Sequence, residues 1–331
     1  MSLKEALFYS KETPVLRCSL CPHNCLIKES AAGICGVRKN LEGILYSENY
    51  GRVTSLAMDP IEKKPLYHFF PGSQILSIGT RGCNLKCPYC QNWSISQNAS
   101  APSSYKKPEE IVALAVKNNS ASIAYTYSEP VVWYEYVYDT ARIAHSRGIK
   151  NVMVTNGFIN EEPLIKLLPF IDAMNIDLKC YDELNYKKFH KGGLEPVKNT
   201  IKTAYANGCH VEVTTLIVTG INDNHDELIE TAEFIASVNK AIPWHISRYH
   251  PSYKYDKPAT SVELLVNAYE AASKILDFVF TGNLHGTSIG SDTICPSCKK
   301  LIISRSGYHT VIKDLNGSNC GNCGYNLGVR A

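Results

Sequence analysis

Short apolar runs alternate with longer segments of helical periodicity between residues 71 and 290. Residues 74–79 predict the first strand, because a short apolar run bounded by turn residues is typical of a buried strand. Six later runs of the same kind predict six further strands. They lie at residues 122–127, 151–155, 173–178, 211–218, 243–247 and 278–281.

The segments between these runs predict helices. Residues 108–116 begin with proline and acidic side chains, which favour a first helical turn. Residues 131–145 and about 224–238 have helical periodicity as well. Thr260 is the expected N-cap of the next helix, and Glu263 completes a capping box. Strands spaced by helices predict right-handed βαβ units and a parallel sheet.

Two architectures fit this number of units. Six or seven strand–helix units build either an open doubly wound sheet or a partial or full α/β barrel, and periodicity does not choose between them. In both architectures a ligand binds at the carboxyl ends of the strands. The residues that follow each predicted strand are therefore the candidates for a functional site.

Composition and charge set limits on the function. The chain has 331 residues, of which 44% are hydrophobic, and its net charge of +3 is close to balance. These values are typical of a globular protein and give no reason to expect nucleic acid as the main partner. The sequence has neither a long apolar run that could span a membrane nor an apolar signal core near its first residue, so we expect a cytoplasmic protein.

Thirteen cysteines are the unusual feature of the composition. An odd number without an expected export signal argues against a disulfide framework and favours metal sites. Three clusters divide the chain into predicted units at residues 1–70, 71–290 and 291–331, and the charged, proline-containing stretch 59–65 ends the first unit. Cys180 and Cys209 are expected to be buried thiols. The clusters are Cys18, Cys21, Cys25 and Cys35; Cys83, Cys87 and Cys90; and Cys295, Cys298, Cys320 and Cys323.

The central cluster follows the first predicted strand, with the spacing CxxxCxxC and an aromatic residue, Tyr89, before its last cysteine. Four thiolates would saturate a [4Fe–4S] cluster, whereas three leave one iron open to another ligand. A zinc site that combines Cys83, Cys87 and Cys90 with a further ligand is the alternative. The segment resembles the signature of the radical SAM superfamily. The resemblance implies that S-adenosylmethionine binds the open iron and that its reductive cleavage gives a 5′-deoxyadenosyl radical.

Two further segments resemble motifs of the same superfamily. Glu129 belongs to a segment similar to Gly-Gly-Glu-Pro, with Tyr127 and Ser128 in place of the glycines, and this implies a contact with the amino group of S-adenosylmethionine. The alternative is a surface glutamate at the start of a helix. Thr155 and Asn156 begin a Thr-Asn-Gly segment similar to that of glycyl-radical-enzyme activating enzymes such as pyruvate formate-lyase activase.

The ends of the later strands supply three more candidates. Asp177 and Lys179 lie two residues apart, so both side chains can face the same way. By resemblance to the activating enzymes they hold the carboxylate or ribose of S-adenosylmethionine, and the alternative is a strand-end ion pair. His245, near the sixth strand, is a candidate hydrogen-bond partner of S-adenosylmethionine or of the substrate, or else a structural histidine.

The C-terminal cysteines form two CxxC pairs in a zinc-ribbon arrangement. Four thiolates fill a tetrahedral zinc, so we expect structural zinc here, with a rubredoxin-like iron as the alternative. A β-hairpin around Gly307 is predicted between the two pairs. The basic residues of this tail are expected on a solvated face, and they are Lys299, Lys300 and Arg305.

The N-terminal cysteines have the spacing C-x2-C-x3-C-x9-C. Zinc and an auxiliary [4Fe–4S] cluster both accept four thiolates, so both remain open for this site. An auxiliary cluster could relay electrons, whereas a zinc ion would only brace the module.

The whole chain, with both flanking cysteine sets and the segment Asp-Pro-Ile-Glu-Lys-Lys-Pro-Leu-Tyr-His-Phe, resembles the AmmeMemoRadiSam system radical SAM enzymes. The resemblance implies a partial (β/α)6-type barrel, an electron donor of the flavodoxin or ferredoxin type, and AMMECR-type and Memo-like partners. The expected reaction is hydrogen abstraction from a protein partner. Radical modification of a small molecule or RNA, and a non-catalytic iron–sulfur scaffold, are the alternatives.

Overall fold

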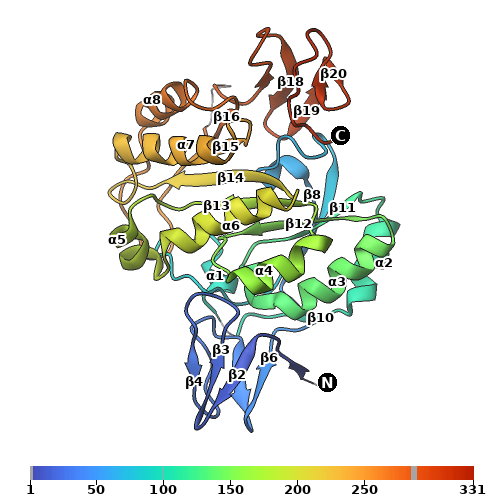
Figure 1. The fold of residues 1–331 in the computed structure, drawn as a ribbon, viewed down its shortest axis with the longest axis vertical. Coiled ribbons are helices and arrows are strands. Elements are labelled where there is room, and N and C mark those ends of the chain that lie inside the picture. The colour runs from blue at the N-terminus through green and yellow to red at the C-terminus, as the bar shows by residue number, and fades with distance from the viewer. Residues whose placement is uncertain (1–2, 99, 285–288) are drawn as a thin grey trace.

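The computed structural model describes residues 3–98, 100–284 and 289–331. One sheet of eight strands forms its centre, in the order β16-β15-β14-β13-β12-β11-β9-β8 (Figure 1). Neighbours from β9 to β16 are parallel, and β8 is antiparallel to β9. The strands are β8 Ser55–Pro60, β9 Gln74–Gly79, β11 Ser122–Tyr125, β12 Lys150–Thr155, β13 Ala173–Asp177, β14 His210–Ile217, β15 Trp244–Arg248 and β16 Val279–Gly282.

All seven predicted strands are present, and the prediction of a partial α/β barrel is confirmed in this open form. Within the described residues, β8 and β16 are the two edges of the sheet and do not pair with each other. Strand β8 was not predicted, because its sequence includes the charged and proline-containing segment that we interpreted as a boundary. The division of the chain at residues 70 and 290 stays a prediction.

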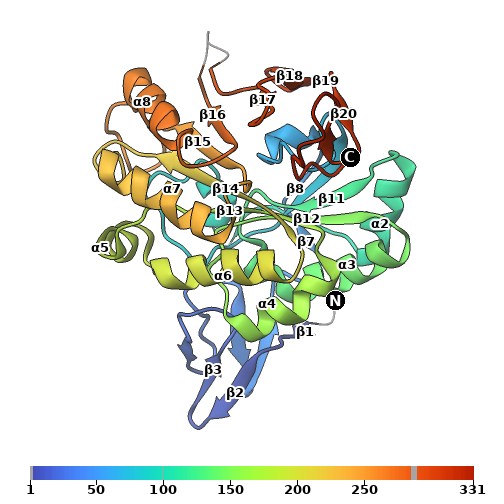
Figure 2. The same cartoon turned by 45° about the horizontal axis from the view of Figure 1, so that its top comes forward.

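Helices cover the outer face of the sheet in an arc (Figure 2). The four predicted helices, α2, α3, α7 and α8, are confirmed, whereas α1, α4, α5 and α6 were not predicted. A 3-10 turn, Pro130–Trp133, precedes α3. The helices are α1 Trp93–Ser96, α2 Pro108–Lys117, α3 Tyr134–Ser146, α4 Glu161–Leu167, α5 Glu183–Asn185, α6 Leu194–Ala206, α7 His225–Asn239 and α8 Val262–Ala272.

The predicted N-cap of α8 was wrong by one residue. The side chain of Ser261 accepts a hydrogen bond from the backbone N–H of Leu264 at 3.1 Å and so caps the helix. Thr260 is buried, and its hydroxyl instead donates to the carbonyl of Ile217 in β14. The Thr260 hydroxyl, which the sequence pattern predicted to cap α8, therefore makes a tertiary hydrogen bond instead.

Alternating residues of the strands separate two apolar layers, as the period of a strand requires. One set, which includes Ile123 and Met153, belongs to the large core that the helices cover. The other set, which includes Ala124 and Val152, packs against Leu66 and forms a small apolar floor inside the curved sheet. The segment between β8 and β9, residues 61–73, therefore fills the inner side of the sheet at one end, and we call it the floor segment.

Two small modules occupy opposite ends of the molecule (Figure 1). The N-terminal strands lie at the lower end, and the C-terminal hairpin, predicted around Gly307, lies at the upper end. The N-terminal strands are β1 Lys4–Glu5, β2 Tyr9–Glu12, β3 Val15–Cys18, β4 Leu26–Ile27, β5 Arg38–Leu41, β6 Ile44–Ser47 and β7 Arg52–Val53, which pairs with β10 Ser104–Tyr105. The C-terminal strands are β17 Thr293–Ile294, β18 Leu301–Ser306, β19 His309–Ile312, β20 Leu315–Asn316 and β21 Asn319–Cys320.

Arg305 in β18 is buried, so the expectation that it lies on a solvated face was wrong. Its guanidinium donates to the carbonyl of Tyr67 at 2.7 Å and lies 4.2 Å from the centre of the Tyr67 ring. Arginine stacks on aromatic rings while it donates hydrogen bonds in its own plane. This residue therefore joins the C-terminal hairpin to the floor segment. None of the helices in the described part of the chain is long and apolar enough to cross a membrane.

The carboxylate of Glu212 in β14 joins the floor segment to the sheet. It is fully buried and accepts from the backbone N–H groups of Tyr67 and His68 at 2.9 and 2.8 Å. The ring nitrogens of His210 and His245 lie 3.0 and 2.6 Å from its oxygens, and both donate because a carboxylate only accepts. Burial alone would raise the pKa of Glu212, but its hydrogen bonds to the two histidines hold that pKa below its usual range.

We expect Glu212→Gln to lower the free energy of unfolding by about 2–4 kcal/mol, because an amide nitrogen then faces two N–H donors in a buried site. Since the pKa of Glu212 is lower in the folded chain, its contribution is complete above pH 4.5 and is lost as the pH falls below that value. Urea denaturation followed by circular dichroism at pH 7 and pH 4 measures both effects. The exposed Glu233→Gln on α7 is the control, and equal stability of the two variants would contradict this role.

Candidate active site

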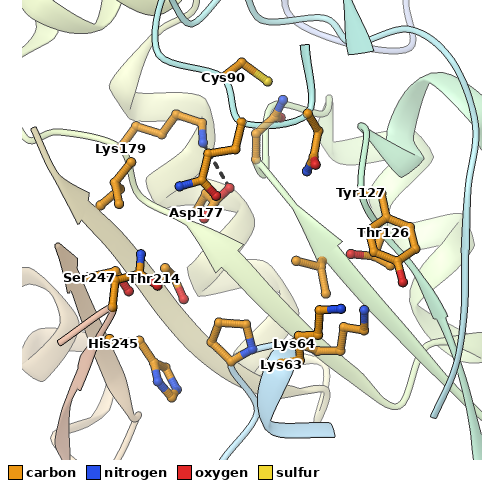
Figure 3. Close-up of a pocket in the computed structure, with 18 of the residues that line it drawn as sticks. Lys63, Lys64, Cys90, Thr126, Tyr127, Asp177, Lys179, Thr214, His245 and Ser247 are labelled. Atoms are coloured by element: carbon orange, nitrogen blue, oxygen red, sulfur yellow. Dashed lines mark hydrogen bonds and ion pairs between the residues drawn. The ribbon is translucent and has the colours of Figure 1, made fainter. Parts of the chain in front are cut away.

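A cavity of about 840 Å³ lies on the inner side of the sheet (Figure 3). Its walls come from the loop after β9 and from the ends of β11 to β16, as expected for parallel strands whose carboxyl ends meet at one edge. The floor segment supplies Lys63, Lys64 and Tyr67, and the turn of the C-terminal hairpin supplies Gly307 and Tyr308. The volume is within the usual range for a site that binds a small molecule or cofactor.

The three central cysteines line this cavity. Cys83 Sγ accepts from the backbone N–H of Leu85 at 3.4 Å and from Asn156 Nδ2 at 3.7 Å, and Cys90 Sγ lies 3.2 Å from Ser96 Oγ. N–H groups directed at thiolate sulfur are the usual surroundings of iron–sulfur ligands. The donor set and its position at the wall of a cavity therefore fit a cluster that keeps one iron accessible.

Neither of the two isolated cysteines is among the described residues that line the cavity. Cys180 is buried and its thiol donates to the carbonyl of Asp182 at 3.5 Å. Cys209 is also buried, and its thiol donates to the carbonyl of His210 at 3.6 Å. Their burial matches the expectation from the sequence. A fourth thiolate for the central cluster, which a non-catalytic scaffold would require, is therefore missing from the described cavity wall.

Glu129, Thr155 and Asn156 meet at the wall of the cavity. The carboxylate of Glu129 accepts from Thr155 Oγ1 at 2.6 Å and from the backbone N–H of Asn156 at 2.8 Å. It also accepts from the backbone N–H of Val131 at 3.0 Å, at the start of the turn before α3. Burial raises the pKa of Glu129 to about 7, although its three hydrogen bonds act in the opposite direction. This carboxylate joins the ends of β11 and β12 next to the cysteine loop.

Asp177 and Lys179 form an ion pair, with 2.9 Å between Lys179 Nζ and Asp177 Oδ2 (Figure 3). Both side chains line the cavity and remain partly accessible. Burial would lower the pKa of Lys179, but the negative charge of the Asp177 carboxylate, followed by that of a Cys87 thiolate, raises it well above its usual value. The arrangement therefore offers a positive and a negative group side by side near the cysteine loop.

His245 lies at the opposite end of the close-up from Cys90 (Figure 3). Its ring stacks on Phe280, with 5.3 Å between the ring centres, while one ring nitrogen donates to Glu212. The histidine is 4% exposed, and it still contributes to the lining of the cavity. The structure thus separates His245 from the other predicted residues and places it beside the floor segment.

Sequence reasoning missed several polar groups of the floor and the walls. Lys63 and Lys64 line the cavity, and their ammonium groups lie 2.9 and 2.7 Å from the carboxylate of Asp59, which also accepts from Tyr127. Thr214 Oγ1 is buried and has no hydrogen-bond partner among the described residues. The run of charges at Asp59 to Lys64 was the available signal, but we interpreted it as a boundary between units.

The four C-terminal cysteines converge on one point. Their sulfurs all lie within 4.8 Å of one another, with 3.6 Å between Cys295 and Cys323 and 3.7 Å between Cys298 and Cys320. This separation suits four thiolates around a single tetrahedral ion. The group can therefore hold one metal ion. The four N-terminal cysteines lie around the β3–β4 loop and the turn before β5, with Cys25 half-buried and the other three buried.

Comparison with known proteins adds sequence relationships. The sequence model described as Radical SAM superfamily matches residues 77–235. An uncharacterized protein of Methanocaldococcus jannaschii is 45% identical over 335 residues, which cover 99% of both chains. A putative glycyl-radical enzyme activating enzyme of the same organism is 30% identical over 232 residues, which cover 66% of this chain and 92% of that relative.

Solved structures show the same fold at low identity. Streptococcus suis SuiB bound to S-adenosylmethionine has a TM-score of 0.51 and 15% identity, and the match covers 66% of this chain and 50% of that chain. SuiB bound to its precursor peptide SuiA has a TM-score of 0.53 and 16% identity, covering 68% and 52%. Because the matched residues 77–235 contain the three-cysteine loop and most of the strands around the cavity, the chain belongs to the radical SAM superfamily.

Proposed function

We propose that this enzyme holds a [4Fe–4S] cluster through Cys83, Cys87 and Cys90 and cleaves S-adenosylmethionine reductively. The observation that carries the proposal is a cavity wall with three cysteines and, in the described residues, no fourth. Membership of the superfamily implies both the cluster and S-adenosylmethionine. The chemistry that the cluster supplies when bound is one-electron reduction of the sulfonium at its open iron, which gives a 5′-deoxyadenosyl radical.

The side chains around the cavity position S-adenosylmethionine in this proposal. Glu129 has three donors on two oxygens, and a carboxylate offers about four acceptor positions, so one remains for the amino group of the ligand. Thr155 and Asn156 keep that carboxylate in place. Lys179 attracts the carboxylate of the ligand, and Asp177 accepts hydrogen bonds from its ribose hydroxyls. His245, at the other end of the cavity, contacts the substrate rather than S-adenosylmethionine.

The substrate of the leading hypothesis is a protein, from which the enzyme abstracts hydrogen as an oxidoreductase. This hypothesis is supported by the 30% identical relative named as a putative glycyl-radical enzyme activating enzyme. An electron donor of the flavodoxin or ferredoxin type supplies the electron. We retain the AmmeMemoRadiSam assignment, with AMMECR-type and Memo-like partners, as part of this proposal.

A small molecule with an acidic group is the second candidate substrate. Two lysines, Lys63 and Lys64, line the cavity at the floor, where both ammonium groups contact Asp59, while the Glu62 carboxylate at the same end accepts from Gly72 and Thr310. Ammonium groups at the wall of a cavity favour a carboxylate or a phosphate as the ligand. We also propose zinc at the C-terminal site, where it braces the hairpin whose turn lines the cavity and whose Thr310 donates to Glu62 at 2.8 Å.

We expect Cys87→Ala to abolish cleavage of S-adenosylmethionine, because two thiolates cannot hold the central cluster with one iron open. The measurement is 5′-deoxyadenosine formed by anaerobically reconstituted enzyme with dithionite, together with the response of the reduced-cluster EPR spectrum to S-adenosylmethionine. Cys209→Ala removes a buried cysteine far from the cavity lining and should keep both signals. Product formation by Cys87→Ala at the wild-type rate would contradict the assignment.

We expect Glu129→Gln to weaken binding of S-adenosylmethionine about tenfold or more, because a hydrogen bond between charged groups is lost. Since the pKa of Glu129 is about 7, the wild-type carboxylate is charged at pH 8 and largely protonated at pH 6. Affinity should therefore fall as the pH decreases in the wild type but not in the variant. Calorimetric titration at both pH values measures this, with the exposed Glu263→Gln as control. A variant with unchanged affinity and the same pH dependence would remove Glu129 from this role.

The two substrate classes predict different radicals. If a protein is the substrate, mixing the reconstituted enzyme, S-adenosylmethionine and reductant with an AMMECR-type, Memo-like or glycyl-radical partner should give a glycyl EPR doublet in the partner. Deuterium at the glycine α-carbon should appear in 5′-deoxyadenosine. Cleavage of S-adenosylmethionine without a doublet in any partner would instead favour the small acidic molecule.

A further inference from the structure

The N-terminal cysteines lie on two turns, and the volume between these turns adjoins the central cysteine loop. Cys18 ends β3, and its backbone N–H donates to the carbonyl of Cys25 at 3.0 Å across the loop to β4. The backbone N–H of Asn24 donates to the carbonyl of Cys21 at 3.0 Å, which closes a tight turn. Cys35 lies in the turn before β5. The chain thus bends twice, and the sulfur of Cys25 lies against the turn that carries Cys35, 3.5 Å from the position of a Cβ atom on Gly33.

Arg38 provides a second observation that points to a ligand in this volume. Its side chain is 2% exposed, and its terminal nitrogens are occupied by Glu135, at 2.9 Å, and by the carbonyl of Leu7. The remaining donor, Nε, is buried and has no partner within the described residues. Arg38 is the first residue of β5 and follows Cys35 by three positions, so this donor lies beside the cysteine-bearing turn. A buried N–H needs an acceptor, and sulfur atoms of a metal site beside it would provide one.

The sulfur positions distinguish the two kinds of metal site. A single zinc ion binds four sulfurs at one point, as the C-terminal cysteines do, whereas the thiolates of a [4Fe–4S] cluster each bind a different iron and stay further apart. In the described parts of the chain, sulfurs that all lie within 4.8 Å of one another occur in the C-terminal group alone. The N-terminal four share their wider arrangement with the central three, which favours a cluster over zinc.

The N-terminal loops touch both residues that flank Cys83. A Cβ atom on Gly82 would lie 2.9 Å from the carbonyl oxygen of Cys35, so only glycine permits this approach. On the other side, the His23 ring hydrogen-bonds the carbonyl of Asn84 at 2.7 Å. The side-chain oxygen of Asn84 accepts from Asn156 Nδ2 at 2.9 Å, and Asn156 Nδ2 also donates to Cys83 Sγ. Packed backbone atoms and hydrogen bonds therefore connect the N-terminal cysteines directly to the central cysteine loop.

We propose that Cys18, Cys21, Cys25 and Cys35 hold a second [4Fe–4S] cluster, which passes electrons one at a time to the central cluster. This inference rests on the proposed function of the central site. The reductant is an external low-potential, one-electron carrier protein. The second cluster gains one electron from this carrier and then loses it to the central cluster, and no atom is transferred. Half-buried Cys25, between the exposed residues Asn24 and Leu26, faces the carrier.

Metal analysis and EPR of anaerobically reconstituted full-length enzyme test the site itself. We expect about eight iron and eight sulfide per chain with about one zinc, since two clusters and one ribbon are present. A chain with Cys83, Cys87 and Cys90 all changed to Ala should retain about four iron and a [4Fe–4S] EPR signal that S-adenosylmethionine does not alter. About two zinc and four iron in the wild type would overturn the proposal.

The relay is tested by the ratio of two rates of 5′-deoxyadenosine formation, one driven by reduced flavodoxin or ferredoxin and the other by dithionite. We expect the Cys21→Ala/Cys25→Ala variant to lower this ratio at least tenfold, because only the carrier protein requires the relay. Cys209→Ala should leave the ratio unchanged. A retained ratio would refute the relay even if the second cluster is present. Failure of the wild type to cleave S-adenosylmethionine with dithionite would instead refute the proposed function, while the iron count still tests the second cluster.

Discussion

The buried carboxylate of Glu212 is the interaction on which the form of the cavity depends. Four N–H groups from three parts of the chain converge on its two oxygens, and two of them belong to the floor segment that closes the inner side of the sheet. A buried charge without these partners would be strongly unfavourable, so this contact stabilises the floor, β14 and β15 together. The C-terminal hairpin is attached to the same floor through Arg305 and Tyr67.

A second buried carboxylate organises the opposite end of the cavity. Glu129 joins the turn before α3 to the end of β12, and Asn156 then extends this contact to Cys83 Sγ and Asn84. The cysteine loop is therefore held by side chains from strands that are distant in sequence. In the proposed complex S-adenosylmethionine touches several of these groups at once, so rigid placement of the loop reduces the cost of binding.

Three cysteine sites in one chain illustrate how number and spacing decide the role of the same side chain. The C-terminal four converge and suit a closed single-ion site, while the central three line the wall of the cavity. The N-terminal set has four cysteines, enough to fill a metal site. Its loops contact Gly82 and Asn84, the residues on either side of Cys83. In the relay proposed above, their position provides the electron path to the cavity, and the close approach of Cys35 explains why a glycine precedes Cys83.

The sequence alone was sufficient to predict the strands of the parallel sheet, the three-cysteine loop after the first of them and the convergence of the C-terminal cysteines, because apolar periodicity and short ligand spacings are local properties. It could not predict that β8 belongs to the sheet, that Ser261 rather than Thr260 is the N-cap of α8, or that Lys63, Lys64 and His245 lie at the floor of the cavity. The first outcome depends on the antiparallel pairing of β8 with β9. The others depend on contacts between residues more than 40 positions apart, such as Thr260 with Ile217 and Tyr67 with Glu212. Only the folded chain brings such groups together, and burial then decides which hydrogen bonds each of them must make.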